Sequence, residues 1–161
     1  FCGERGDGLH LCGLSLGAVL ALQYALEHPA SVESLTLIAG RARMPRALLK
    51  VQGALFRLMG EKNFREMGLT RVDAITLTAS MARLDFRPDL GRLRCPALVL
   101  CGEKDGANRR EAAALAAGIP GAGLAFLPGA GHEVNREAPE ALAEVLGQFY
   151  GTAQMGKDFG K

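Results

Sequence analysis

Apolar residues occur along the chain in two patterns, as short continuous runs and as runs with helical periodicity. The apolar run 9–12 leads into Gly13-Leu14-Ser15-Leu16-Gly17, and good helix formers follow over residues 18–27. This order predicts a strand, a tight turn and a helix. His28-Pro29 ends the helix, and residues 35–39 form a second apolar run. Together these segments predict a βαβ unit with parallel strands.

Residues 41–93 show helical periodicity instead. Their first part carries apolar residues on one face and basic residues elsewhere: Leu48, Val51, Leu55, Leu58 and Met59 against Arg46, Lys50 and Arg57. This pattern predicts an amphipathic helix. A second helix is predicted from Thr70, as N-cap, to near Leu84, before Pro88. We interpret residues 41–93 as an inserted helical lid.

Strand and helix patterns alternate again after residue 93. The apolar run 96–101 ends in a loop, and the pattern then predicts a helix over 109–117, a strand over 123–127 and a helix over 139–150. Residues 151–161 are polar and contain glycine, which predicts a frayed tail. The predicted fold class is therefore α/β, a mostly parallel sheet with flanking helices, whose core comprises residues 1–40 and 94–150.

Composition restricts the class of partner. The chain has 161 residues, 48% of them hydrophobic, which suffices for one compact domain with a buried core. Lys and Arg number 19 against 17 Asp and Glu, and this near balance does not favour nucleic-acid binding. We therefore expect no nucleic-acid partner and a small-molecule substrate.

The cysteines and the chain start bear on location. Cys2, Cys12, Cys95 and Cys101 form no C-x-x-C pair, which favours reduced thiols and a cytoplasmic protein. No apolar run reaches the roughly 18 residues of a membrane span, and no signal-peptide pattern opens the chain. Because the chain starts with Phe1 and not with Met, we expect it to be cut from a longer protein.

The segment Gly13–Gly17 is the strongest chemical motif. G-x-S-x-G between a strand and a helix is the nucleophile-elbow pattern, in which flanking glycines let strand and helix approach closely. Ser15 is then the candidate nucleophile, and the backbone N–H of Leu16 is the candidate oxyanion donor at the start of the helix.

Serine needs a base and an orienting acid to act as a nucleophile. Asp105 follows the predicted strand 96–101, and His132 lies in a glycine-rich loop after the predicted strand 123–127. Both residues are expected at the sheet edge that carries Ser15. Glu103, two residues before Asp105, is a competing acid.

The segments 13–17, 102–105 and 129–133 with Pro139 resemble the α/β-hydrolase family over roughly residues 9–150. The resemblance implies an α/β-hydrolase fold with a lid between its sixth and seventh strands, and acyl transfer through Ser15, His132 and Asp105. The family's first four strands have no counterpart here, and neither has the loop that donates the second oxyanion amide. The strand edge from Leu9 to Cys12 would then be exposed and would seek a partner strand, from the absent half or from a second copy.

The resulting function prediction is a serine hydrolase of a small carboxylic ester or thioester with an apolar or acyl group. The same resemblance leaves open a C–C bond or enol-lactone hydrolase, and a non-catalytic ligand-binding member of the fold. No cofactor and no metal ion are expected. The basic lid stretch 41–60 is interpreted as a solvated helix face rather than a site for anionic substrates or membranes, and its apolar face as a cover for the pocket.

Overall fold

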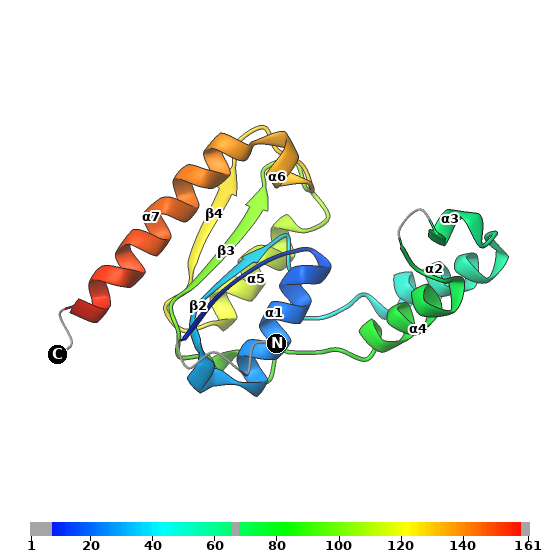
Figure 1. Ribbon diagram of the computed structural model, residues 1–161, viewed down its shortest axis with the longest axis horizontal. Coiled ribbons are helices and arrows are strands. Elements are labelled where there is room, and N and C mark those ends of the chain that lie inside the picture. Colours follow the sequence, from blue (N-terminus) through cyan, green and yellow to red (C-terminus); the bar gives the residue numbers. More distant parts are fainter. Residues whose placement is uncertain (1–7, 66–67, 159–161) are drawn as a thin grey trace. The chain divides into compact units, whose positions relative to one another are not determined.

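The computed structural model describes residues 8–65 and 68–158, in which strands and helices alternate on both sides of a helical insertion (Figure 1). In the first part lie β1 (Leu9–Leu14), α1 (Leu16–Glu27) and β2 (Val32–Ile38). The insertion holds α2 (Arg46–Leu58), α3 (Lys62–Arg65) and α4 (Arg71–Met81). The last part holds β3 (Ala97–Gly102), α5 (Arg109–Gly118), β4 (Gly123–Leu127), α6 (Val134–Glu137) and α7 (Pro139–Asp158). Short 3₁₀ turns occur at Pro29–Ser31 and Leu90–Arg92.

The four strands form one parallel sheet in the order β1-β2-β3-β4. Leu14 pairs with Ile38, so β1 and β2 end in register, and Ile38 pairs with Leu100, two residues before β3 ends at Gly102. Because parallel strands share one carboxyl edge, the loops that follow β1, β2, β3 and β4 meet at that edge. The sheet positions the functional residues through this single edge.

Helices cover both faces of the sheet (Figure 1). On one face α1 packs on β1 and β2, and α5 packs on β3 and β4. On the other face α7 contributes Leu142, Val145 and Phe149 to a cluster with strand residues that include Ile38 and Leu100. Leu100 and its neighbour Val99 are fully buried, as expected for a central parallel strand covered twice.

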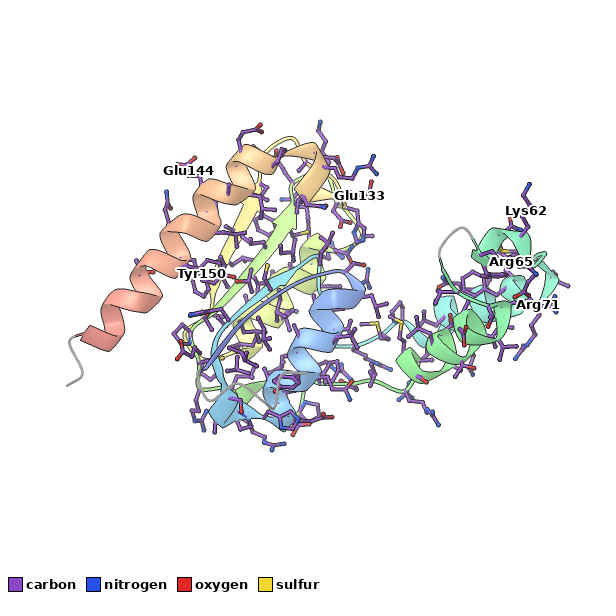
Figure 2. All side chains as sticks on the ribbon, viewed as in Figure 1. Lys62, Arg65, Arg71, Glu133, Glu144 and Tyr150 are labelled. Atoms are coloured by element: carbon purple, nitrogen blue, oxygen red, sulfur yellow. The ribbon has the colours of Figure 1, made fainter. Side chains whose placement is uncertain are left out.

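A buried polar contact also joins α7 to the sheet. The hydroxyl of Tyr150 lies 3.2 Å from Oγ1 of Thr36, which is fully buried on β2 (Figure 2). Desolvation of the tyrosine and the neighbouring Cys12 raise the pKa of Tyr150 above its ordinary value, and the hydrogen bond with Thr36 only partly opposes this. The hydroxyl therefore stays protonated, and this buried threonine has a hydrogen-bond partner.

Helix α7 continues to Asp158, whereas the sequence predicted that it ends at Tyr150. Gly151 lowers helix propensity by only about 1 kcal/mol relative to alanine, and no proline follows it. The hydroxyl of Thr152 also donates to the carbonyl of Phe149 within the helix. The predicted frayed tail is therefore wrong for residues 151–158, and residues 159–161 lie outside the described part.

Residues 43–86 form a compact unit of their own, inside the predicted lid 41–93. Helices α2 and α4 pack on each other, and Arg43 and Asp85 pair across the base of the unit. Thr70 is the N-cap of α4, as predicted, and forms a capping box with Asp73. This reciprocal pair of hydrogen bonds satisfies the helix start.

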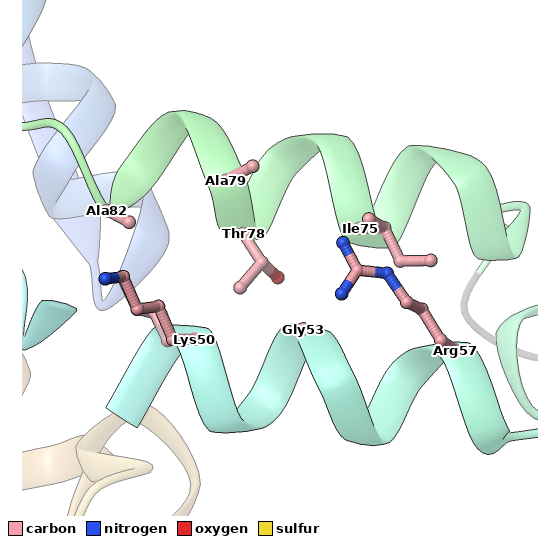
Figure 3. A pocket seen from close by; sticks show the side chains of 8 residues that line it. Lys50, Gly53, Arg57, Ile75, Thr78, Ala79 and Ala82 are labelled. Carbon is pink, nitrogen blue, oxygen red and sulfur yellow. The ribbon is translucent and has the colours of Figure 1, made fainter. Parts of the chain in front are cut away.

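The face of α2 that packs on α4 is not the predicted apolar face but the one that carries Leu49, which is buried. A groove of about 230 Å³ between the two helices is lined on the α2 side by Leu49, Lys50, Gly53 and Arg57, and on the α4 side by residues that include Ile75, Thr78 and Ala79 (Figure 3). Three apolar residues of α2 are exposed instead, with exposed fractions of 67% for Val51, 55% for Leu55 and 85% for Leu58. We call these three residues the α2 stripe. The side chain of Leu48, predicted on the same face, lies outside the described part.

No helix in the described residues is both long and apolar enough to cross a membrane. Cys12, Cys95 and Cys101 form no disulfide, and Cys2 lies outside the described residues.

Candidate functional site

Ser15 lies at the junction of β1 and α1 in a strained backbone conformation. Its φ is 54° and its ψ is −110°, a region that non-glycine residues rarely adopt. The Ser15 N–H donates to the carbonyl of Ile38 at 2.8 Å, which ties the turn to β2. Such strain persists only where the surrounding structure fixes it, and it is concentrated at functional sites.

The close approach in this turn depends on Gly13. A Cβ at Gly13 would lie 2.2 Å from the carbonyl oxygen of Gly17, which is backbone and cannot move aside. A Cβ at Gly17 would meet open space. The motif predicted a steric requirement for glycine at both positions, and in the described structure it falls on Gly13.

Asp105 and His132 come together because their loops pack backbone against backbone. A Cβ at Gly102 would lie 2.0 Å from the carbonyl oxygen of Gly131. The N–H of Lys104 donates to the carbonyl of Ala130 at 2.8 Å. A glycine at the end of β3 therefore lets the histidine loop lie against the aspartate loop.

Two glutamates fix the histidine loop. Oε2 and Oε1 of Glu137 accept from the N–H groups of Gly131 and Glu133, at 2.8 and 3.0 Å. Glu103 accepts from the N–H of Gly129 at 3.2 Å. Glu103, the competing acid of the sequence analysis, thus braces the loop and leaves the contact with His132 to Asp105.

The three predicted residues form a hydrogen-bonded array. Nε2 of His132 lies 3.1 Å from Oγ of Ser15, and Nδ1 of His132 lies 2.8 Å from Oδ2 of Asp105. An ionised carboxylate only accepts hydrogen bonds, so the proton of neutral His132 lies on Nδ1. Nε2 is then free to accept the Ser15 proton. This arrangement can deprotonate a serine during attack on an electrophile.

Asp105 is kept ionised by its partners. Burial acts to raise the pKa of Asp105, but hydrogen bonds from Asn108 and His132 and the charge of His132 outweigh it, so the pKa lies below its ordinary value. The Asp105 side chain is only 6% exposed, while that of His132 is 47% exposed. The acid is therefore shielded, whereas the base remains accessible from solvent.

Asn108 and Arg41 also contact this array, and neither was predicted from the sequence to belong to it. Nδ2 of Asn108 donates to Oδ2 of Asp105 at 2.7 Å, and Nε of Arg41 donates to Oδ1 of Asn108 at 2.7 Å. The sequence gives only a weak indication of this role. Asn108 follows Asp105 by three residues, and Arg41 follows the apolar run 35–39.

Leu16 is the first residue of α1. Its N–H is one of the free donors at a helix start, and it makes no hydrogen bond within the described residues. The N-terminal end of α1 also carries partial positive charge that favours an anion. This N–H can therefore help to hold an oxyanion formed at Ser15.

Two other titratable groups, Cys101 on β3 and Asp89 in the segment before β3, have separate roles. Burial, together with the charge of Asp105, raises the pKa of Cys101 to about 11, although Arg109 opposes the shift. The thiol stays neutral and does not compete as a nucleophile. Asp89 pairs with Arg92 at 2.9 Å. No group of three or more His, Cys, Asp or Glu residues within 8–65 and 68–158 has a metal-binding arrangement.

Comparison with known proteins agrees with this fold. A family model described as the alpha/beta hydrolase family matches residues 1–145. A solved hydrolase from Pseudomonas aeruginosa PA01 is 25% identical with a TM-score of 0.80, and the match covers 90% of this chain and 65% of that one. An enol-lactonase from Burkholderia xenovorans LB400 is 21% identical with a TM-score of 0.79 and coverages of 89% and 66%.

A third solved structure, NosK from Streptomyces actuosus, is 27% identical with a TM-score of 0.76 and coverages of 94% and 72%. The chain thus spans 65% and 66% of the first two structures. A comparison with curated proteins finds no match. The fold class predicted from the sequence is confirmed.

We predict that Gly13→Ala and Gly17→Ala have opposite effects on stability. The clash of a Cβ with backbone at Gly13 should lower the free energy of unfolding by about 1–3 kcal/mol or more. Alanine at Gly17, in open space within the first turn of α1, should be neutral or stabilising by up to about 1 kcal/mol. Urea unfolding measures both values. Equal destabilisation by the two variants would contradict the assignment.

Proposed function

We propose that this chain, which belongs to the alpha/beta hydrolase family, serves as a serine hydrolase of small carboxylic esters or thioesters. The observation that carries the proposal is the array in which Ser15 contacts His132 and His132 contacts Asp105, at 3.1 and 2.8 Å. The strained φ of Ser15 supports it, because the turn holds the hydroxyl out at the carboxyl edge of the sheet.

The proposed reaction proceeds through an acyl-serine. His132 takes the proton of Ser15 as Oγ attacks the carbonyl carbon, and the Leu16 N–H stabilises the oxyanion. His132 then gives the proton to the leaving alcohol or thiol as the ester bond breaks. A water molecule, deprotonated by His132, attacks the acyl group, releases the acid and restores Ser15. Every proton passes through His132, so this route requires no cofactor.

Two other functions are compatible with the same fold. A C–C bond or enol-lactone hydrolase would use the same three residues, and one similar structure is an enol-lactonase. A non-catalytic ligand-binding member would have no need for the contact between His132 and Ser15. The close array therefore favours a hydrolase, and a panel of acyl esters, thioesters and lactones distinguishes the substrate classes.

We predict that a fluorophosphonate labels the folded chain at Ser15 alone. Peptide mass mapping locates the label, and Ser15→Ala should abolish it. His132→Ala should lower the labelling rate by about 10³-fold or more, because the serine then lacks its base.

Ser31→Ala is the matched control, since Ser31 is an exposed serine in the same part of the chain and should leave labelling unchanged. Heat-denatured protein should not react. If folded wild-type protein is not labelled, the chain by itself is not a working serine hydrolase.

We also propose that the unit of residues 43–86 acts as a substrate lid whose α2 stripe binds the apolar part of the substrate. An exposed apolar stripe is unfavourable in water unless another apolar group covers it. Val51, Leu55 and Leu58 are all more than half exposed, and α4 packs on a different side of α2. An acyl chain is a ligand of the required chemistry.

We predict that Leu55→Glu selectively impairs the hydrolysis of long acyl esters. The variant should lower kcat/KM for p-nitrophenyl octanoate by about 10-fold, because a charge replaces an apolar contact, and change it less than about twofold for the acetate. Ser80→Glu, on an exposed position of α4, is the control. An equal effect on both esters would refute a role in acyl binding.

The exposed edge of β1 is a third element of the proposal. β1 lies at one end of the described sheet, so one side of its backbone has no partner strand within the described residues. The residues of β1 are half-buried or exposed, except the buried Gly13. We propose that this edge pairs with a further strand, supplied by a longer protein or, in the isolated chain, by a second copy.

We predict that the isolated chain associates under reducing conditions and that Cys12→Lys shifts it towards monomer. Cys12 is exposed on β1, and a lysine on an edge strand opposes pairing. Leu124→Lys on β4, at the opposite end of the sheet, should leave association unchanged. Sedimentation velocity over a range of concentrations measures the outcome, and a monodisperse wild-type monomer would exclude pairing through this edge.

A further inference from the structure

We propose that Asn108, oriented by Arg41, is a positioning residue that holds the carboxylate of Asp105 towards His132. The inference deepens the proposed function and rests on it. Its basis is a chain of short contacts that extends the array from Asp105 to the loop after β2.

The NH₂ group of Asn108 donates a hydrogen bond to the carboxylate of Asp105. Nδ2 of Asn108 lies 2.7 Å from Oδ2 of Asp105, the same oxygen that Nδ1 of His132 contacts at 2.8 Å. Nδ2 also lies 3.2 Å from Nδ1 of His132. With Asp105 ionised, both nitrogens donate to the one oxygen, and their mutual distance follows from that convergence. The asparagine thus fixes which oxygen faces the histidine and in which direction.

Arg41 determines the orientation of the Asn108 amide. A guanidinium only donates, so the atom of Asn108 that lies 2.7 Å from Nε of Arg41 must be the carbonyl oxygen. The NH₂ group then has to face Asp105. Nη2 of Arg41 also donates to the carbonyl of Ala107 at 2.7 Å, which holds the guanidinium against the same loop. A flipped amide would place its oxygen against the carboxylate and its NH₂ group against the arginine.

The backbone supports this placement of Arg41. Ala39 has a φ of 50°, and its N–H donates to the carbonyl of Leu100 at 2.8 Å. A Cβ at Gly40 would lie 3.1 Å from Cβ of Ala18 and 3.5 Å from Cδ2 of Leu115. The chain after β2 therefore turns sharply and in a tight space, two residues before Arg41 contacts the aspartate loop. A non-glycine residue at positive φ is strained, and such strain is found where function requires it.

Asn108 makes these contacts in place of its usual helix role. It is the N-cap of α5, where an asparagine side chain normally accepts from a backbone N–H, yet its side chain makes no capping bond. It is 7% exposed and makes its hydrogen bonds with Arg41 and Asp105 instead. The Asn108 side chain therefore makes its hydrogen bonds within the array and does not cap the start of α5.

Two substitutions separate positioning from a merely structural role. Asn108→Asp keeps the shape and the acceptor for Arg41 but places a second carboxylate against Asp105 in place of the donor, whereas Asn108→Leu removes both contacts without adding charge. If Asn108 only tied two loops together, the leucine variant would lose stability but would leave the pKa of Asp105 unchanged. If it positions Asp105, both variants should lower the rate of fluorophosphonate labelling at Ser15 by about 10- to 100-fold, the usual effect of one hydrogen bond to a charged group.

The pH dependence gives a second readout. Hydrogen bonding holds the pKa of Asp105 low, so the carboxylate persists as the pH falls. Without the donor the pKa of Asp105 rises, and the low-pH limb of the labelling profile should move to higher pH. Arg41→Ala should show a smaller loss than Asn108→Asp. The double variant Arg41→Ala/Asn108→Leu should be no worse than Asn108→Leu alone, because Arg41 acts only through the Asn108 amide.

Asn135→Asp is the matched control, since it introduces the same charge at an exposed residue of α6. It should change neither the rate nor the profile. An equal shift in this control would overturn the proposal in favour of a general charge effect, and unchanged labelling in Asn108→Asp would overturn it directly.

A ¹³C NMR titration of the Asp105 carboxyl group distinguishes failure of this inference from failure of the proposed function. A rise of the Asp105 pKa in Asn108→Leu supports positioning even if Ser15 of the wild type is unreactive. An unchanged Asp105 pKa in that variant refutes positioning even if Ser15 is labelled normally.

Discussion

The arrangement at the carboxyl edge depends on two close approaches of backbone to backbone, at Gly13 and at Gly102. In each, a Cβ would lie about 2 Å from a carbonyl oxygen of the next segment. Such contacts exist only where no side chain intervenes. They bring the start of α1 against β1, and the histidine loop against the end of β3. Without these two close approaches, the loops could not bring Ser15, Asp105 and His132 within hydrogen-bond distance of one another.

The sheet provides the remaining precision. Parallel strands in register end at one edge, and the central strands β2 and β3 are buried between α7 on one face and α1 and α5 on the other. A close-packed core resists small displacements, so the loops start from fixed positions. Hydrogen bonds from Glu103 and Glu137 then hold the histidine loop itself. The strands and helices therefore fix where the loops begin, and only short loop segments connect them to Asp105 and His132.

The sequence predicted what short-range patterns determine. Apolar runs located all four strands, and the G-x-S-x-G motif located the turn at Ser15, because its geometry needs only local residue types. The pattern indicated the wrong packing face of α2, because tertiary contact buries Leu49 and leaves Val51 and Leu55 exposed. The C-terminal end of α7 was missed because glycine and threonine argue only weakly against a helix.

Asn108 shows most clearly why part of a site is not predictable from one sequence. An asparagine before a helix is, by propensity, an N-cap, and in sequence Asn108 cannot be told from one. Its actual role follows from Arg41, which lies 67 residues earlier in the chain and comes within 2.7 Å only after β2 and β3 pair. The helix start forgoes a capping bond of roughly 1 kcal/mol. A hydrogen bond to a buried carboxylate contributes about 1.5–3 kcal/mol, so the exchange is favourable, and Asp105 gains a fixed orientation.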